Sequence, residues 1–373
     1  MRRVRIMTDR FGMAWRPELA LDLHRSAGRV EVLEFLAEEW FGASRQRLAS
    51  LAAWCREIPC HLHGTSLGLA SATPIAPERL CCWKELIDTV QPARWSEHLA
   101  FVRGGGVELG HLAAPSRNVD SLAGAVANLR RIRDAVGSMP LVENVATLMA
   151  PPGSDWAEPV WLSAVVGASG AGLLLDLHNL HTNAVNQGWD ALTALDDLPL
   201  ERVEAVHLAG GRRWRGRILD DHQHPVPEAV FALLEGLAAR VSGPLDIIIE
   251  RDGSFPAFGE LLDELDAARA AVAAGRARRR VVRPAQVAAS ATLLTAPLAL
   301  AAGRWEAFLA RLYTDSVLRA EFLADPGASA RAAGFDERAA ASLAAIDREG
   351  LVLVSESLAA KRSSRLASTS HAQ

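Results

Sequence analysis

The sequence predicts an α/β fold, a TIM (β/α)8 barrel, followed by a small all-helical C-terminal domain. Short β-like runs alternate with longer helical patterns as far as about residue 270, which is typical of a parallel sheet with helical crossovers. Eight such units in about 250 residues fit a closed barrel. A doubly wound open sheet is the alternative, but it requires a Gly-rich phosphate-binding turn after its first strand, and none is present.

The expected strands are short apolar runs separated by helical patterns. They lie at Val4–Thr8, Val30–Phe35, Ile58–Leu62, Arg94–Leu99, Leu141–Glu143, Ala171–Asp176, Val203–Leu208 and Leu245–Glu250. Helices are expected between them, among others at Ser44–Arg56, Pro77–Val90, Val119–Val136, Trp156–Val166, Pro227–Arg240 and Leu262–Ala274. The triplet Gly104-Gly105-Gly106 lacks the spacing of a phosphate-binding turn, so we expect a flexible loop there.

The chain beyond the barrel has a different pattern. A basic, Ala-rich stretch begins at Gly275 and is expected to be an exposed linker. From residue 304 the pattern is helical, since Trp305, Phe308, Leu309 and Leu312 fall on one face of a helix. We expect the barrel at 1–275, a linker at 276–303, a helical domain at 304–361 and a disordered, Ser-rich tail at 362–373.

Composition restricts the classes of protein to which the chain can belong. Half of the 373 residues are apolar, which is enough for a substantial core, and the formal net charge is −4. A mildly acidic chain is not suited to holding polyanions by bulk charge, so no nucleic-acid partner is expected. Four cysteines in a chain of this length do not indicate a disulfide framework. Without an apolar signal core or a convincing membrane span, the chain is expected to be cytoplasmic, with no membrane partner.

Imidazole and carboxylate residues mark the carboxyl ends of six expected strands. They are His63, His98, Glu143, Asp176, His207 and Glu250, and the loop after the seventh strand adds Asp220 and His222. In a barrel these strand ends converge on the face where active sites are built. Any one of these residues alone is more often structural, but the whole set would be costly to gather without a charged species among them.

The types of side chain in this set favour a multinuclear metal centre. Mixed His and carboxylate ligands suit iron, zinc or manganese, and the absence of a Cys argues against a thiolate zinc site. The groups are too numerous for one ion. Two or three ions bridged by carboxylates are therefore expected, with Glu143 and Glu250 as the bridges.

The segments around these residues have a specific combined pattern. They are His63-Gly64-Thr65-Ser66-Leu67-Gly68, Ser96-Glu97-His98-Leu99-Ala100, Glu143-Asn144-Val145, Leu174-Leu175-Asp176-Leu177-His178-Asn179-Leu180, Asn183-Ala184-Val185-Asn186, His207-Leu208-Ala209-Gly210, Asp220-Asp221-His222-Gln223-His224-Pro225-Val226 and Ile249-Glu250-Arg251-Asp252. In this order, from about Phe11 to Arg269, they resemble the DUF692 family, the multinuclear non-heme iron-dependent oxidative enzymes (MNIO).

The resemblance implies a barrel of the xylose-isomerase type that binds two or three iron ions in mixed Fe(II)/Fe(III) states. It implies an oxidoreductase that uses dioxygen as co-substrate to modify a residue of a ribosomally synthesised precursor peptide. Cys is the expected target, or else Asp or Asn. Members of this family often act with a separate partner protein that recognises the leader peptide, so such a partner is a further expectation.

Carried over residue by residue, the resemblance implies nine metal ligands. They are His63, His98, Glu143, Asp176, Asn179, His207, Asp220, His222 and Glu250, of which Glu143, Asp220, His222 and Glu250 are expected to be catalytic. Substrate contacts are expected at His178, His181, Asn183, Arg213 and His224. Many members have Asn-Asn-Leu-Tyr where this chain has His178-Asn179-Leu180-His181, so His178 or His181 can serve in place of Asn179.

Other functions on the same barrel are alternatives. The ligand order also resembles that of endonuclease IV, a multizinc phosphodiesterase, and a sugar isomerase is a further possibility on this fold. The basic segment Arg212–Arg217 can hold DNA phosphates, an acidic peptide, or only solvent. A non-catalytic peptide-binding module is disfavoured, because binding alone does not need nine ligand-type groups. The helical appendage is expected either to dock a peptide or partner, or merely to pack or dimerise.

Overall fold

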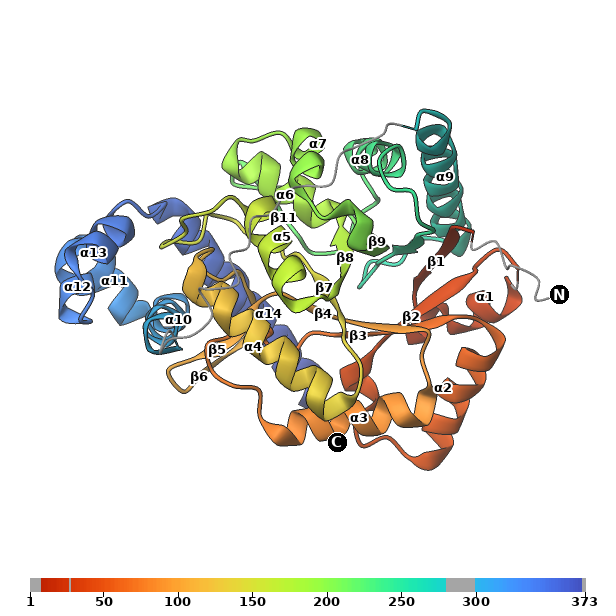
Figure 1. Cartoon of the computed structure of the whole chain (residues 1–373), viewed down its shortest axis with the longest axis horizontal. Helices are drawn as coiled ribbons and strands as arrows, with labels where there is room; N and C mark the ends of the chain where they lie inside the picture. Colours follow the sequence, from red (N-terminus) through yellow and green to blue (C-terminus); the bar gives the residue numbers. More distant parts are fainter. Residues whose placement is uncertain (1–7, 27, 280–298, 371–373) are drawn as a thin grey trace.

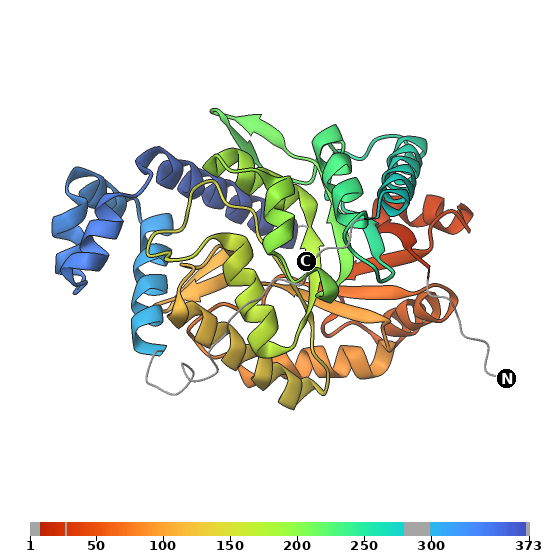
Figure 2. The same cartoon turned by 45° about the horizontal axis from the view of Figure 1, so that its top comes forward.

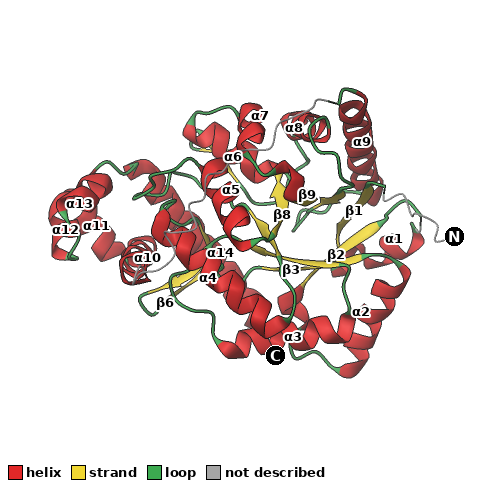
Figure 3. Cartoon of the chain, viewed as in Figure 1, coloured by secondary structure: helices red, strands yellow, loops and turns green. Residues whose placement is uncertain are grey.

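The computed structural model describes residues 8–26, 28–279 and 299–370. Eight parallel strands close into a barrel in the order β1-β12-β9-β8-β7-β4-β3-β2, and Figure 3 shows these strands at the centre with helices around them. The barrel strands are β1 (Arg10–Ala14), β2 (Val32–Leu36), β3 (Cys60–Gly64), β4 (Arg94–His98), β7 (Leu141–Glu143), β8 (Gly172–Asp176), β9 (Val203–Leu208) and β12 (Asp246–Ile249). The predicted fold class is confirmed.

Helices connect the barrel strands on the outside. They are α1 (Ala20–Arg25), α2 (Arg45–Glu57), α3 (Pro77–Val90), α4 (Val119–Val136), α5 (Glu158–Ser169), α6 (Leu177–Gln187), α7 (Ala191–Ala194), α8 (Glu228–Ala238) and α9 (Phe258–Ala277). Local sequence determines several of their ends. Asn118 and Ser121 form a capping box at the start of α4, and Gly137 ends that helix in the left-handed conformation.

Short 3₁₀ helices and two hairpins complete the barrel region. The 3₁₀ helices are η1 (Pro17–Leu19), η2 (Ala37–Trp40), η3 (Leu195–Asp197) and η4 (Leu200–Arg202). The antiparallel hairpins are β5 (Phe101–Gly104) with β6 (Val107–Ala113), and β10 (Arg212–Trp214) with β11 (Arg217–Leu219).

Two expectations for the barrel region need correction. The first barrel strand is β1, whereas the expected strand Val4–Thr8 lies almost wholly outside the described residues. The glycine triplet is not a flexible loop, because Gly104 ends β5 and the other two glycines form the tight turn of the β5–β6 hairpin. Its residues Gly105 and Gly106 have φ values of 56° and 80°, which glycine adopts without steric cost.

The C-terminal part is helical, as predicted, with different boundaries. Its helices are α10 (Ala299–Thr314), α11 (Ser316–Ala324), α12 (Pro326–Ala332), α13 (Glu337–Ala344) and α14 (Arg348–Ser370). The expected linker at 276–303 is wrong at both ends, because α9 continues to Ala277 and α10 begins at Ala299; residues 280–298 lie outside the described part. The tail expected to be disordered from residue 362 is helical as far as Ser370.

A second hydrophobic core joins the C-terminal helices to the barrel region. In Figures 1 and 2 the blue helices α10–α13 lie together at one side of the barrel, and α14 returns toward it. The second core contains Phe101 and Leu109 of the β5–β6 hairpin together with Phe308, Phe322 and Leu351 of the C-terminal helices. The C-terminal helices therefore pack directly on a connection at the carboxyl end of the barrel.

An ion-pair network closes the amino end of the barrel. Asp246 at the start of β12 contacts Arg10 at 2.6 Å, Arg94 at 2.8 Å and His61 at 2.9 Å. Burial alone raises the pKa of Asp246, but the interactions with His61, Arg10 and Arg94 outweigh it and lower this pKa to about 2.

The carboxyl end of the barrel carries imidazole and carboxylate groups of its own. Among the described residues, Arg16 is the one arginine that pairs with these groups. No helix among residues 8–26, 28–279 and 299–370 is long and apolar enough to cross a membrane.

Candidate metal centre

Buried imidazole and carboxylate groups gather at the carboxyl end of the barrel. Within the described part of the chain they form four overlapping groups whose ligand atoms lie within 4.8 Å of one another. The groups are His63, His98 and Glu143; Glu143, Asp176, His207 and Glu250; His178, Asp220 and His222; and His222, Glu250 and Asp252. Glu143, Glu250 and His222 each belong to two of the groups, so the four groups form one continuous cluster.

The first group is held by hydrogen bonds on its outer side. His98 Nδ1 lies 2.9 Å from the carbonyl oxygen of Gly64 and must donate to it, so Nε2 of the neutral ring carries a lone pair. That Nε2 lies 3.3 Å from Glu143 Oε2, and His63 Nε2 lies 3.4 Å from the same oxygen. A lone pair that faces a carboxylate oxygen is repulsive, and a metal ion or a proton between the two atoms relieves the repulsion.

The second group surrounds His207 on β9. Its Nδ1 lies 3.2 Å from both Glu143 Oε1 and Glu250 Oε2. Although burial disfavours a charged imidazole, the carboxylates of Glu34, Glu143 and Glu250 raise the pKa of His207 well above its usual range. For the neighbouring Asp176 the surroundings disfavour the charged form of the side chain. Burial, with Glu143 and Asp220 nearby, raises its pKa to about 7.

The third group lies beside the β10–β11 hairpin. Asp220 Oδ1 lies 2.9 Å from His178 Nδ1 and 2.8 Å from His222 Nε2. Gly211 allows the chain before β10 to lie against the ring of His178, because a Cβ at this position would lie 2.8 Å from His178 Cε1. His222 itself has a φ of +53°, a conformation that costs a non-glycine residue free energy and is often found at functional sites.

Several buried atoms of these groups have no hydrogen-bond partner in the described part of the protein. They are His63 Nε2, Glu143 Oε2, Asp176 Oδ2, His178 Nε2 and Asn179 Oδ1. An unsatisfied buried polar atom costs about 1–3 kcal/mol, so their convergence at one place requires a compensating ligand. Imidazole nitrogen and carboxylate oxygen are donors that suit iron, manganese or zinc. The residues present therefore fit a multinuclear metal centre.

The segment after β8 carries Asn179 and its two alternatives as a ligand, His178 and His181. Asn179 is buried, and its amide Nδ2 donates to the carbonyl oxygen of Asn144 at 3.0 Å, which leaves Oδ1 as its possible ligand atom. His178 lies in the third group, and His181 does not lie in any of the four groups. Of the two residues that were alternatives to Asn179, the structure thus places His178 among the ligand-type groups.

The expected substrate contacts lie in different environments. His181 on α6 is half-buried, and burial together with neighbouring His178 and Arg213 lowers its pKa. Arg213 on β10 is exposed, and His224 is partly exposed and pairs with Asp221 at 2.9 Å. These three side chains are therefore not fully buried.

Asn183 is wrongly placed among the substrate contacts. It is fully buried, its Nδ2 donates to Val145 O and Glu158 Oε2, and its Oδ1 accepts from Thr147 N. These hydrogen bonds satisfy the whole amide group. The side chain is a clamp for the loop that follows Glu143.

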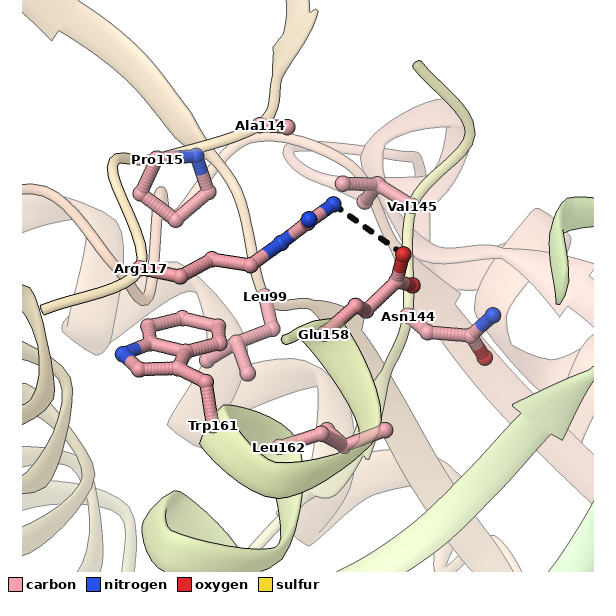
Figure 4. Close-up of a pocket in the computed structure, with 9 residues that line it drawn as sticks. All are labelled: Leu99, Ala114, Pro115, Arg117, Asn144, Val145, Glu158, Trp161 and Leu162. Atoms are coloured by element: carbon pink, nitrogen blue, oxygen red, sulfur yellow. Dashed lines mark hydrogen bonds and ion pairs between the residues drawn. The ribbon is translucent and has the colours of Figure 1, made fainter. Parts of the chain in front are cut away.

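A buried ion pair supports the same loop. Arg117 Nη2 donates to Glu158 Oε2 at 3.0 Å, and both side chains are buried. Figure 4 shows this pair across a small cavity, with Asn144 and Val145 at its side. Asn144 in turn exchanges two hydrogen bonds with the backbone of Asp176, so the loop after β7 is tied to β8.

Sequence reasoning missed three residues around the site. Glu34 on β2 lies against His207, Asp252 belongs to the fourth group, and Arg16 lies 3.6 Å from Glu250. Arg16 also forms a very short contact with Asp252. One feature of the sequence could have indicated Glu34, because it is the single acidic residue of an otherwise apolar strand. A carboxylate is costly to bury there unless a partner compensates its charge.

The C-terminal helices reach the edge of the site. Lys361 Nζ on α14 lies 3.4 Å from the carbonyl oxygen of Asp220 and 2.6 Å from His111 Nε2. Arg217, in the hairpin that precedes Asp220, forms an ion pair with Asp347. The helix α14 therefore contacts the connection that carries the third group.

Comparison with known proteins identifies the family. Residues 10–273 match the family described as "RiPP precursor modification enzyme MbnB/TglH/ChrH", where RiPP denotes a ribosomally synthesised and post-translationally modified peptide. The chain belongs to this family. It is thus a member of a family of enzymes that modify precursor peptides, as the sequence resemblance indicated.

Curated relatives of the chain carry the name UPF0276 protein. One, from Streptomyces avermitilis, is 40% identical over 267 residues, which are 69% of this chain and 54% of the relative. Another, from Caulobacter vibrioides, is 33% identical over 271 residues, which are 72% of this chain and 96% of the relative. The matched region thus spans about half the length of the Streptomyces relative.

Solved structures with a similar barrel are more distant. An L-ribulose 3-epimerase has a TM-score of 0.47 at 15% identity, with 73% of this chain and 97% of that chain covered. An endonuclease IV from Thermus thermophilus has a TM-score of 0.46 at 15% identity, with 71% and 99% covered. A xylose isomerase domain protein from Alicyclobacillus acidocaldarius subsp. acidocaldarius has a TM-score of 0.47 at 18% identity, with 71% and 99% covered.

Proposed function

We propose that this RiPP precursor modification enzyme is an iron- and dioxygen-dependent oxidase. Its substrate is a precursor peptide, and the residue that it modifies is Cys as the first choice and Asp or Asn as the second. The observation that supports the proposal is the convergence of buried, unpartnered imidazole and carboxylate atoms at the carboxyl end of a barrel that belongs to this family.

The ligands divide among two or three iron ions. His63 and His98 bind one ion with Glu143, and His207 binds another with Asp176 and Glu250. Asp220 and His222, with His178, form the third site, and Asn179 Oδ1 is an additional weak ligand beside Asp176. Iron changes oxidation state, which zinc does not, and so it supplies the redox chemistry that dioxygen activation requires.

The chain's own residues prepare this centre for chemistry. Hydrogen bonds to Gly64 O and Ser96 Oγ orient the rings of His98 and His63 so that Nε2 of each faces Glu143. Burial excludes water from these groups, which strengthens each electrostatic interaction among them. Catalytic roles for Glu143, Asp220, His222 and Glu250 are part of the proposal, and their membership of the candidate metal groups supports it.

The peptide approaches from the side of the β10–β11 hairpin. Arg213, His181 and His224 lie at the edge of the third group and are not fully buried, so they are the candidates for contacts with the peptide. A separate partner protein that recognises the leader peptide is part of the proposal. The C-terminal helices, which border the same edge, take part in docking the peptide or that partner.

The test combines metal analysis with a defined reaction. Anaerobically purified protein is analysed for its metals, and the reduced, iron-loaded enzyme is then incubated with the cognate peptide in the presence or absence of dioxygen. The expected result is more than one iron ion per chain and a change in peptide mass that needs both iron and dioxygen. Active protein that contains only zinc, or a mass change that proceeds without dioxygen, would contradict the oxidase.

A further inference from the structure

Glu34 is a buried carboxylate inside the barrel that belongs to none of the four candidate metal groups of the described residues. It lies on β2 and is only 2% exposed. Its side chain contacts His207 on β9, which is separated from β2 by β1 and β12 in the barrel order. His207 Nε2 lies 2.9 Å from Glu34 Oε1 and 3.0 Å from Oε2.

Both ring nitrogens of His207 face carboxylates, Nδ1 toward Glu143 and Glu250 and Nε2 toward Glu34. Because only the carboxylates on the Nδ1 side belong to a candidate metal group, the hydrogen that remains when a metal ion binds the ring lies on Nε2. An ionised carboxylate only accepts hydrogen bonds, so Nε2 must be the donor to Glu34. In the neutral imidazole the lone pair is then on Nδ1. That atom lies 3.2 Å from both Glu143 Oε1 and Glu250 Oε2, at the centre of the second candidate group.

We infer that Glu34 is a positioning residue of the metal centre, which holds His207 in the tautomer and ring orientation that present Nδ1 to the metal ion. Glu34 acts through His207 and does not bind the ion itself. A carboxylate behind a histidine ligand also makes the imidazole a stronger donor. The inference rests on the metal centre of the proposed function, but it does not depend on iron or on dioxygen.

The barrel contains a matched pair that serves as a control. His61 Nε2 lies 2.9 Å from Asp246 Oδ2 at the amino end of the barrel, and both residues are buried. This pair has the same chemistry as the pair of Glu34 and His207, but neither member belongs to a candidate metal group within the described ranges. Loss of its hydrogen bond therefore measures the structural cost of such a pair without an effect on the metal centre.

The experiment is a titration of the metal-free, full-length protein with Co²⁺, followed by visible absorption. Glu34→Leu removes the hydrogen-bond acceptor of His207. We expect it to weaken Co²⁺ binding at the site that contains His207 about 10- to 100-fold. It should also alter the Co²⁺ band that this site produces. Glu34→Gln retains an acceptor oxygen and should restore most of the affinity. His61→Leu should leave both affinity and spectrum unchanged.

Each result decides the inference. Equal Co²⁺ binding by wild type and Glu34→Leu, or equal losses in Glu34→Leu and His61→Leu, would show that Glu34 has only a structural role. If Glu34→Leu does not fold, Glu34→Asp replaces it: its shorter side chain cannot keep the contact, so unchanged Co²⁺ affinity would overturn the inference. Wild-type protein that binds no Co²⁺ would instead refute the metal centre itself, and the inference with it.

Discussion

The carboxylate of Glu306 on α10 accepts the backbone N–H of Ala72, with its two oxygens at 2.7 and 2.8 Å from the nitrogen. Ala72 lies in the connection after β3, the strand that carries His63. This contact joins the C-terminal helices to the segment that follows β3 at the candidate metal centre. Glu306 is 5% exposed, and because a buried charge is costly, the protonation state of its carboxyl group affects the stability of this interface.

Stability should depend on pH through Glu306. Burial raises its pKa to about 8, against the effects of Ala72 and Arg103, which lower it. The folded protein therefore holds this proton more tightly than the unfolded chain, and the free energy of unfolding should fall as pH rises from about 4.5 to about 8. Glu306→Gln removes the ionisation, so its free energy of unfolding should decline less over this range.

The measurement is urea unfolding of wild type and Glu306→Gln at several pH values between about 5 and about 8.5. The exposed Glu57 provides a control, since Glu57→Gln should follow the wild-type curve. Parallel pH dependence in wild type and Glu306→Gln would show that Glu306 does not titrate in this range in the folded protein.

Replacement of Asp220 and His222 together by Ala should remove one metal ion while the barrel still folds. Both residues belong to the third group, and His178 alone cannot hold an ion there. Elemental analysis should show one ion fewer per chain, peptide modification should be lost, and circular dichroism should be unchanged. Asp221→Asn is the control, because Asp221 lies outside the four groups and pairs with His224. An unaltered metal count in the double variant would refute the third site.

Glu97→Gln should destabilise the connection after β3. Glu97 Oε2 accepts from the backbone of Ser66 and Leu67, and Oε1 accepts from the backbone of His98. A Gln side chain has one acceptor oxygen, so at least one of these N–H groups would face a donor. We expect a loss of about 1–3 kcal/mol in the free energy of unfolding.

Urea unfolding measures this loss, and the exposed Glu108 is the comparison. Glu108→Gln should change the free energy of unfolding by less than about 0.5 kcal/mol, because its ion pair with Arg103 is largely exposed on the Glu108 side. Equal effects of the two substitutions would mean that the buried hydrogen bonds of Glu97 do not stabilise the connection.

Gly104→Ala should weaken the packing of α10 on the β5–β6 hairpin. A Cβ at this position would lie 2.5 Å from the backbone oxygen of Glu306, so the helix must shift. Such overpacking costs about 1–3 kcal/mol and should make the C-terminal helices more susceptible to limited proteolysis. At Gly167 in α5 a Cβ would meet no atom within 4 Å apart from its own helix backbone and chain neighbours, so Gly167→Ala should stabilise the protein by about 0.5–1 kcal/mol. Equal protection of the C-terminal helices in both variants would contradict the close contact.

Local patterns in the sequence were sufficient for the elements with strong signals. The expected helices Pro77–Val90 and Val119–Val136 and the strand Val203–Leu208 coincide with α3, α4 and β9. A proline in the first turn, a capping box and an apolar run determine these elements without help from distant residues. The parallel alternation of such elements then determines that the strand ends, with His63, Glu143 and their counterparts, meet on one face.

Contacts between distant residues decided the rest. A flexible loop was expected at the triplet Gly104-Gly105-Gly106, whereas the segment forms the β5–β6 hairpin, whose Phe101 and Leu109 pack against the C-terminal helices. The role of Glu34 likewise depends on a partner 173 positions away in the sequence. The role of an acidic residue in an apolar strand cannot be predicted from the strand alone. The free energy of burying its charge depends on the group that lies opposite it once the barrel has closed.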